Sequence, residues 1–384
     1  MKKLLPWLLI GLAIRLGLMM YTVHPDIRGH NLAAYLIAQK GQILSLYDYL
    51  RLQPRTDPWV VLYRDDIFAY PPLAYLTHAI FNFFLYPVYP QQLFHTLILD
   101  IGQTAGHPQL SWLLFLLKFP YLVADFVGLL VIYRLLEPKH RFLGSILWIF
   151  NPLTLYSAYM LAQFDIFIAL FILLALLRPQ LAPVFIGIAA GFKPFPIFFL
   201  PFIPGSKLKN ITTGLLTYGL LILPYLPSIG FRQYALLASQ TDKISYAKIA
   251  VSGSQYLPLF FVGLVLLFWL NYFRPKLLPD WAWPMSVLLL FYSLTHFHPQ
   301  WFTWITPFLI LTFIHVRKSP PLLVTLLLCH LLIIFSFDSS LNFGLFGLNL
   351  SLRGWLTDAN VSLVRAALAG TSLGLMMLLS HERS

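Results

Sequence analysis

Charged side chains are scarce in this sequence. Only 10% of its 384 residues are charged and 59% are hydrophobic, whereas a typical soluble domain is about 25% charged and about 45–50% apolar. With a mean hydropathy of +0.74, too few polar residues remain to cover a water-soluble core. The composition excludes a soluble enzyme and intrinsic disorder, and it predicts a protein that crosses a membrane many times.

Cysteine, internal repeats and low-complexity tracts are also lacking. The single cysteine, Cys329, lies inside an apolar run, which excludes a disulfide framework and a thiolate metal site. The absence of a repeat in the hydropathy pattern disfavours the common transporter folds.

The basic residues give a formal net charge of +12, but they do not gather on one arm, so a nucleic-acid partner is not indicated. They form short groups between apolar runs, as in positively charged cytoplasmic loops: Lys2-Lys3, Lys139 to Arg141, Lys207 and Lys209, Arg274 and Lys276, and Arg317-Lys318. The first apolar run ends without the small residues of a signal-peptide cleavage site, so we expect a retained helix.

Apolar runs long enough to cross about 30 Å of hydrocarbon recur along the whole chain, at 4–23, 111–136, 142–162, 209–227, 255–273, 281–297, 301–316, 320–338 and 361–380. The run 164–178 is short, and the run 181–204 is broken at Gly191–Pro194. We therefore expect a single all-α polytopic domain, 1–384, with about 11–13 membrane helices.

The run 70–88 decides the threading. If this run lies on the outer surface of the membrane, the groups of basic residues fall on the cytoplasmic side, where short loops are usually rich in lysine and arginine. The alternative is that the run crosses the membrane and that another break in the chain restores the same orientation of the later loops. We therefore predict a long first outer loop, 24–110, with juxtamembrane helices, and a second outer loop at 228–254.

In this threading, ionisable and amide side chains gather at the outer boundary of the membrane, where such costly groups mark functional sites. They are Asp26, Arg28, Lys118, Gln163, Asp165, Lys193, His296, His298 and Gln300. His30, Asp65 and Tyr70 of the first outer loop are further candidates for substrate binding.

This set suits a lipid-anchored phosphate. Lys118 and Lys193 can act as point charges on a phosphate, and the broken helix at Lys193-Pro194 offers a half-helix N-terminus. Asp26 can take a proton from an attacking hydroxyl. The alternatives are that Asp26 caps a helix, that Lys118 snorkels to the interface and that Asp125 hydrogen-bonds a neighbouring helix.

Metal ligation by His296 and His298 is only weakly indicated, because neither a nearby cysteine nor a zinc-type spacing accompanies them. The sequence therefore indicates no metal or other cofactor, although it leaves a divalent metal open.

Six segments resemble, in order, motifs of the GT-C superfamily of glycosyltransferases that use a polyprenyl-phosphate sugar, most closely the bacterial and GPI-type mannosyltransferases. They are Pro25-Asp26, Tyr70-Pro71-Pro72-Leu73, Lys118 to Asp125, Asn151-Pro152 with Gln163-Phe164-Asp165, Phe192-Lys193-Pro194, and His298-Pro299-Gln300.

The resemblance implies a GT-C fold and an inverting transfer in which Asp26 deprotonates the acceptor hydroxyl. The donor would be a polyprenyl-phosphate sugar, and the acceptor a lipid-linked molecule or a glycan. Independently of the resemblance, the basic Arg28 is a further candidate ligand of the donor phosphate. The reaction would occur on the extracytoplasmic side, in a bacterial inner membrane rather than the endoplasmic reticulum. Two departures stand out: Arg28 replaces a second acid of the GPI enzyme, and Ala162 replaces a glycine.

Two other classes of protein remain open. A transporter or flippase for a phosphorylated lipid or sugar would use the same cations and broken helix, but it would need polar groups near mid-membrane. A membrane acyltransferase would need a buried catalytic histidine, for which His330 is the candidate. The sugar and the acceptor are not specified by the sequence.

Overall fold

The computed structural model describes residues 2–64, 66–237, 239–337 and 357–381, so the candidate Asp65 lies outside the described residues. The chain is mostly helical. Its α-helices are α1 (Leu5–Tyr21), α2 (Asp26–Lys40), α3 (Leu46–Leu52), α4 (Pro58–Tyr63), α5 (Pro72–Leu85), α6 (Gln91–Leu99), α7 (Leu110–Leu135), α8 (Arg141–Ile149), α9 (Pro152–Thr154), α10 (Asp165–Leu177), α11 (Ala182–Ala190), α12 (Lys207–Ile222), α13 (Leu259–Phe273), α14 (Ala282–Leu294), α15 (Thr306–His315), α16 (Pro320–Ser336) and α17 (Asp358–His381).

Shorter helical segments connect these helices. Two are π-helical, namely η4 (Leu155–Met160) and η8 (Phe231–Leu236). The others are 3-10 helices: η1 (Lys2–Leu4), η2 (Tyr86–Val88), η3 (Gly102–Thr104), η5 (Pro179–Leu181), η6 (Phe195–Phe202), η7 (Leu223–Tyr225), η9 (Ser239–Ser245) and η10 (Pro299–Ile305).

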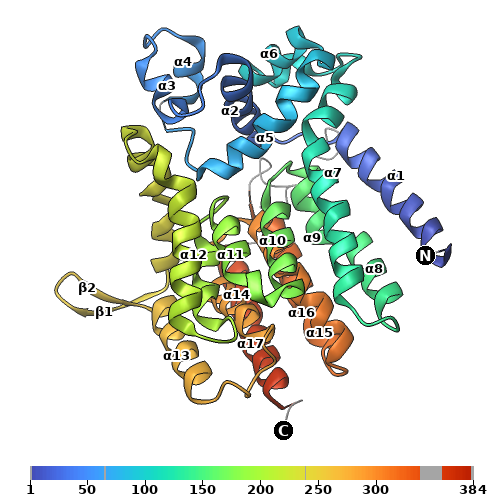
Figure 1. Cartoon of the computed structure of the whole chain (residues 1–384), viewed down its shortest axis with the longest axis vertical. Helices are drawn as coiled ribbons and strands as arrows, with labels where there is room; N and C mark the ends of the chain where they lie inside the picture. The colour runs from blue at the N-terminus through green and yellow to red at the C-terminus, as the bar shows by residue number, and fades with distance from the viewer. Residues whose placement is uncertain (1, 65, 238, 338–356, 382–384) are drawn as a thin grey trace.

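The helices form two regions. Figure 1 shows α2 to α6 gathered at one end of the molecule, above a bundle made of the longer helices, with the C-terminus at the opposite end. Within the upper region α2 packs against α5 and α6. The segment 24–110 therefore folds as a helical cap, and the ambiguous run 70–88 contributes α5 to it.

One part of the chain departs from the all-α expectation. Strands β1 (Lys248–Ser252) and β2 (Gln255–Pro258) form an antiparallel hairpin that projects from the side of the bundle (Figure 1). Gly253 at its tip has φ = 55°, a left-handed conformation that glycine adopts without steric cost. The predicted run 255–273 is thus a strand followed by α13.

Two helices, Leu110–Leu135 and Asp358–His381, are long and apolar enough to cross a membrane. Other predicted runs are divided. The run 142–162 splits because the Asn151 side chain accepts hydrogen bonds from the N–H groups of Leu153 and Thr154 and Pro152 opens α9, which is a strong signal for a new helix start. The number of membrane crossings remains a prediction.

The predicted break in the run 181–204 is confirmed: α11 ends at Ala190 and the next helical segment begins at Phe195. Its second half is a 3-10 helix, not the α-helix expected from the sequence. Pro194, Pro196 and Pro201 lie in or beside this segment, and because proline has no N–H and clashes with the preceding turn, they disfavour a regular α-helix.

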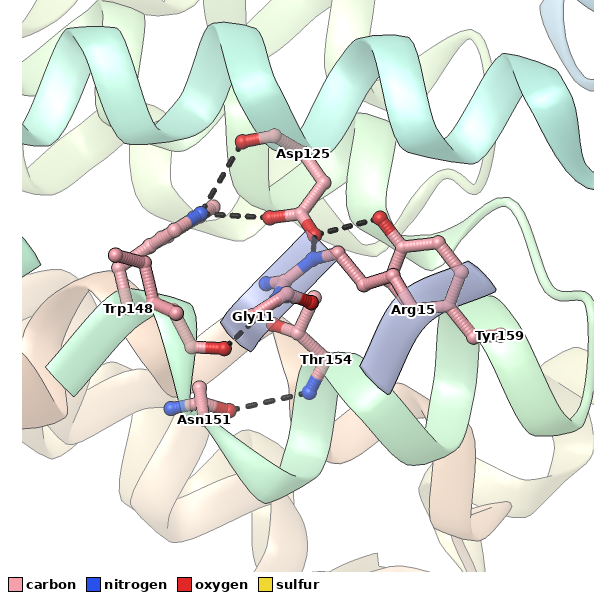
Figure 2. Close-up of polar contacts among 8 residues, drawn as sticks. Gly11, Arg15, Asp125, Trp148, Asn151, Thr154 and Tyr159 are labelled. Carbon is pink, nitrogen blue, oxygen red and sulfur yellow. Dashed lines mark hydrogen bonds and ion pairs between the residues drawn. The ribbon is translucent and has the colours of Figure 1, made fainter. Parts of the chain in front are cut away.

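A buried ion pair joins α1 to α7. Arg15 Nε lies 2.6 Å from Asp125 Oδ2, and Asp125 also accepts hydrogen bonds from Tyr159 Oη and Trp148 Nε1, at 2.6 and 2.7 Å. Arg15 Nη1 donates to the carbonyls of Gly11 and Ile149. Figure 2 shows these contacts converging on the Asp125 carboxylate. The alternative in which Asp125 bonds neighbouring helices is confirmed.

Candidate functional site

Asp26 lies where α1 gives way to α2. It is the first residue of α2, a position at which the helix dipole favours a negative charge. Gln163 Nε2 donates a hydrogen bond of 2.6 Å to Asp26 Oδ2, and His24 Nδ1 accepts one of 3.2 Å from the Asp26 backbone N–H. The Asp26 side chain is still 41% exposed. One oxygen is therefore held in place while the carboxylate stays accessible.

An unusual backbone conformation positions Gln163. The π-helix η4 precedes it, and Ala162 has φ = 54°, a left-handed conformation that costs an L-residue about 1–2 kcal/mol. The Ala162 carbonyl accepts a hydrogen bond of 2.7 Å from Tyr121 Oη.

A cavity of about 550 Å³ opens beside Asp26, within the range of about 300–1,000 Å³ typical of small-molecule sites. Its walls come from α2, from the segment after α4 and from the turn before η10. They include nine side chains with polar atoms: His24, Asp26, Arg28, His30, Tyr63, Asp66, Tyr70, His298 and Gln300. The structure thus brings together five of the predicted residues near the predicted base, plus His24, Tyr63 and Asp66, which the sequence analysis missed.

A second hollow, a groove of about 220 Å³, adjoins this cavity and shares Ala69 and Tyr70 with it. We call it the apolar groove. Among its lining residues that the structure describes, Lys193 alone is charged. The remaining walls are Pro71, Pro194, Phe195, Ile197, Phe198, Ala235, Ile244, Phe291, Trp301 and Trp304. A polar cavity and an apolar groove therefore meet at one wall.

The groove is tied to the helical cap through η8. The Gly230 N–H, at the start of η8, donates a hydrogen bond of 2.8 Å to Asp48 Oδ1. A Cβ at Gly230 would lie 2.1 Å from the Tyr47 carbonyl oxygen, so this close approach requires glycine. The contact fixes η8, and with it the groove residue Ala235, against α3.

Lys193 is buried in the wall of the apolar groove. Its Nζ lies 2.7 and 2.9 Å from the two Asp165 carboxylate oxygens, and Trp304 Nε1 donates to Asp165 Oδ1 at 2.6 Å. Its ammonium faces the rings of Phe164, Tyr70, Trp301 and Trp304 at 4.7–5.6 Å from their centroids. Asp165 thus neutralises Lys193 directly.

Lys243 of η9 was missed by the sequence analysis because no motif surrounds it in the segment 228–254. Its Nζ lies 2.5 Å from His298 Nε2 and 5.7 Å from the Trp301 ring centroid. Burial and the positive charge of Lys193 lower the pKa of Lys243. Burial, together with Lys243 and Lys193, lowers the pKa of His298 to about 3, so His298 is neutral.

Three buried polar atoms beside this contact, His298 Nδ1, Gln300 Oε1 and Trp301 Nε1, have no hydrogen-bond partner within the described ranges. Buried polar atoms in folded proteins are usually hydrogen-bonded, and leaving one unsatisfied costs about 1–3 kcal/mol. Such a cluster is typical of a site whose missing partners belong to a substrate.

Lys118 does not reach this site. It is fully buried, and its Nζ donates to the Thr22 carbonyl at 2.6 Å and to Thr22 Oγ1 at 2.9 Å. The last carbonyls of α1 therefore satisfy its charge, as they do for cations at helix C-termini, and the structure gives no support to a role for Lys118 on a phosphate.

The remaining candidates lie around the cavity. Burial lowers the pKa of His30, which packs on Phe164 and His78. Arg28 stacks over the Tyr63 ring, with its guanidinium carbon 5.7 Å from the ring centroid. His296 packs on Tyr246 and is not among the lining residues of either hollow.

No group of three or more His, Cys, Asp or Glu side chains that could hold a metal occurs in the part of the chain that the structure describes. His330 stacks on Phe302 at 4.3 Å and does not line the cavity or the groove. No family model, curated protein or solved structure matches the chain.

Proposed function

We propose that this chain is an integral membrane glycosyltransferase of the GT-C type. It transfers a hexose, with mannose as the first candidate, from a polyprenyl-phosphate sugar to an acceptor hydroxyl. The chain crosses a bacterial inner membrane several times, and its helical cap and cavity lie on the extracytoplasmic side. The acceptor is a lipid-linked molecule or a glycan.

The observation that carries this proposal is the shared wall between the polar cavity and the apolar groove. A polyprenyl-phosphate sugar has the same division, since an apolar chain is joined through a phosphate to a polar ring. With the chain in the groove, the sugar lies in the cavity beside Asp26 and the phosphate lies near Lys193, Lys243 and His298.

The chemistry follows from this orientation. Asp26 accepts the proton of the acceptor hydroxyl, whose oxygen then attacks C1 of the sugar. The bond between C1 and the phosphate oxygen breaks, and its electron pair leaves with the polyprenyl phosphate. Because attack and departure take place on opposite faces of C1, the configuration inverts. Gln163 orients the Asp26 carboxylate.

The membrane setting is supported by composition and by the distribution of charge. The high hydropathy and the two helices long enough to span a bilayer favour an integral protein. The short groups of basic residues favour an orientation with the cap outside. A groove at that boundary allows a lipid donor to approach sideways from the bilayer.

The test is to incubate the purified protein with polyprenyl-phosphate mannose and polyprenyl-phosphate glucose, with and without a glycan acceptor, and to measure released polyprenyl phosphate. Asp26→Asn should lower the rate by about 10²–10⁴-fold, as for loss of a general base, whereas the exposed control Asp100→Asn should leave it unchanged. Sugar transfer by Asp26→Asn at the wild-type rate would refute the catalytic role. Donor transport without sugar release would favour the flippase alternative.

A further inference from the structure

The β1–β2 hairpin stands apart from the rest of the chain. Figure 1 shows it projecting sideways from the bundle beside α13, and all of its strand residues except Pro258 are exposed. Among them, Ile249, Val251 and Leu257 are 54%, 60% and 47% exposed. A two-stranded hairpin alone is marginally stable in water, and apolar side chains on exposed edge strands favour association. The hairpin therefore needs a covering layer, which the described residues do not supply.

The pairing of the strands gives the base of the hairpin two different faces. Ile249 pairs with Leu257, whereas the next residue, Ala250, pairs with Tyr256. Because paired residues share a face and neighbours along a strand point to opposite faces, Ile249 and Leu257 form one face, which we call the Ile249 face. Lys248 lies on the other, the Lys248 face, with its Nζ 4.4 Å from the centroid of the Tyr256 ring. One face is thus apolar, and the other combines an aromatic ring with a positive charge.

The base of the hairpin is fixed to the ends of two bundle helices. The Ala247 N–H donates a hydrogen bond of 3.3 Å to the carbonyl of Leu294, the last residue of α14. The N–H of Leu259, the first residue of α13, donates one of 2.9 Å to the Ala247 carbonyl. From this point α13 exposes a row of apolar side chains, namely Val262, Val265, Leu266 and Trp269. The hairpin therefore leaves the bundle where the surface that a bilayer would cover begins.

The backbone of the hairpin limits how deep it can lie in a bilayer. Its sheet has two strands, so each strand has one edge without a partner strand in the described part of the chain. Hydrocarbon cannot satisfy the N–H and C=O groups of such an edge, and open edges do not occur within it. Water satisfies the edges but leaves the Ile249 face exposed. The head-group layer meets both needs, and it is also the layer in which tyrosine and lysine side chains are favourable.

We infer that the β1–β2 hairpin lies flat in the head-group layer of the outer leaflet, with the Ile249 face toward the acyl chains and the Lys248 face toward the head groups. Its partner is therefore a lipid surface. The inference rests on the proposed function for the membrane setting and for the side of the membrane.

This contact bears on the apolar groove. Ile244, which lines the groove, lies three residues before Ala247 at the base of the hairpin. A hairpin held in the head-group layer therefore keeps this wall of the groove at the level from which a lipid donor would enter.

The experiment measures the depth of the hairpin in proteoliposomes of the purified full chain. The buried Cys329 is replaced by alanine, and a fluorescent label is attached to Val251→Cys. Because interfacial segments lie only about 5–10 Å into the boundary between head groups and acyl chains, lipids with a shallow nitroxide should quench this label at least about twofold more strongly than lipids with a deep nitroxide. Two reference labels complete the set: Leu373→Cys on α17 should respond most to the deep nitroxide, and Gln103→Cys on the helical cap to iodide in the water.

A matched pair of variants tests the orientation of the hairpin. Ile249→Asp places a charge on the face toward the acyl chains, and since such a charge is costly there, shallow quenching of the label at position 251 should fall at least about twofold. Ala250→Asp places the same charge one residue away on the Lys248 face and should leave the quenching unchanged. Equal effects of the two substitutions would overturn the inferred orientation.

The three label positions separate this inference from the proposed function. If the label at 373 responds to the deep nitroxide but the label at 251 responds only to iodide, the membrane setting is retained and the inference is overturned. A label at 251 shielded from both quenchers, or a disulfide between two Val251→Cys chains, would show that a second copy covers the hairpin and would also overturn it. Iodide quenching at 373 would remove the membrane setting together with the inference. Because no step measures sugar transfer, a chain that inserts in this way but transfers no sugar would lose the enzyme and keep the lipid contact.

Discussion

The buried ion pair around Arg15 and the cavity around Asp26 both place charged groups inside a mostly apolar protein, but their surroundings differ. Asp125 accepts hydrogen bonds from Arg15, Tyr159 and Trp148, and the space beside the pair is only about 10 Å³, at the lower limit of what one water molecule needs. Asp26 accepts a hydrogen bond from Gln163, its one side-chain donor among the described residues, and lines a cavity of about 550 Å³. A saturated, closed cluster stabilises the fold, whereas an unsaturated, open one is suited to a substrate.

The largest expected effect is on the closed cluster. Asp125→Ala leaves Arg15 buried without a counter-charge, and it should lower the free energy of unfolding by about 3–5 kcal/mol, measured by thermal unfolding of the purified protein. Replacing both partners, as Arg15→Met with Asp125→Leu, should recover part of this loss because no charge is then stranded. A mild effect of Asp125→Ala would show that the cluster is not structural.

Gln163→Leu tests the open side of the comparison. Without Gln163 the Asp26 carboxylate loses the side chain that orients it, so kcat should fall by about 10–100-fold. Because a hydrogen bond to a charged group contributes about 1.5–3 kcal/mol to stability, the free energy of unfolding should fall by no more than about that amount. Gln103→Leu, at an exposed position, serves as the control. Loss of stability without loss of kcat would place Gln163 with the structural cluster instead.

Ile197→Trp sharpens the distinction between cavity and groove. A larger side chain on the groove wall should raise KM for a long-chain donor by about tenfold, about 1.4 kcal/mol, and leave KM unchanged for a donor with a very short chain. Val262→Trp, on the 49% exposed Val262 of α13, controls for the added indole. Equal effects on both donors would show that the chain does not lie in the groove.

The smallest effect concerns acid stability. The pKa of His298 is about 3, below its ordinary 6.5, chiefly because of burial. The unfolded chain therefore binds a proton that the folded chain does not, and stability is lost as pH falls from about 6.5 toward 3. His298→Asn should reduce the drop in melting temperature between pH 7 and pH 5. An unchanged drop would show that His298 does not remain neutral in the fold.

Much of this organisation follows from local sequence. The break after α11 was predicted because Gly191 and Pro194 interrupt an apolar run. Helices in the segment 24–110 were also predicted, one of them capped by Asp26; α2 begins at Asp26 itself. The hairpin was missed because Lys248–Ser252 and Gln255–Pro258 are exposed strands without a buried face to give an alternating pattern.

Contacts between distant segments were less accessible. Asp26 and Gln163 were both candidates, but their hydrogen bond depends on the left-handed Ala162, which no residue preference would suggest. Lys118 was taken for a phosphate ligand because the carbonyls that accept its hydrogen bonds, those of Leu18 in α1 and of Thr22 just after α1, are about 100 residues away in the sequence. Trp301 and Trp304, three residues apart, share one face of a 3-10 turn, a signal that could have located the groove.

Ala162 has a consequence for how the protein can vary. Glycine there would relieve backbone strain but would let the following peptide swing, and a β-branched residue would not tolerate the conformation at all. The residue at position 162 therefore affects two properties in opposite directions: the stability of the fold, and the precision with which the Gln163 amide is held against Asp26, 137 residues earlier in the chain. Alanine preserves the orientation of Gln163 and lowers the stability of the fold somewhat.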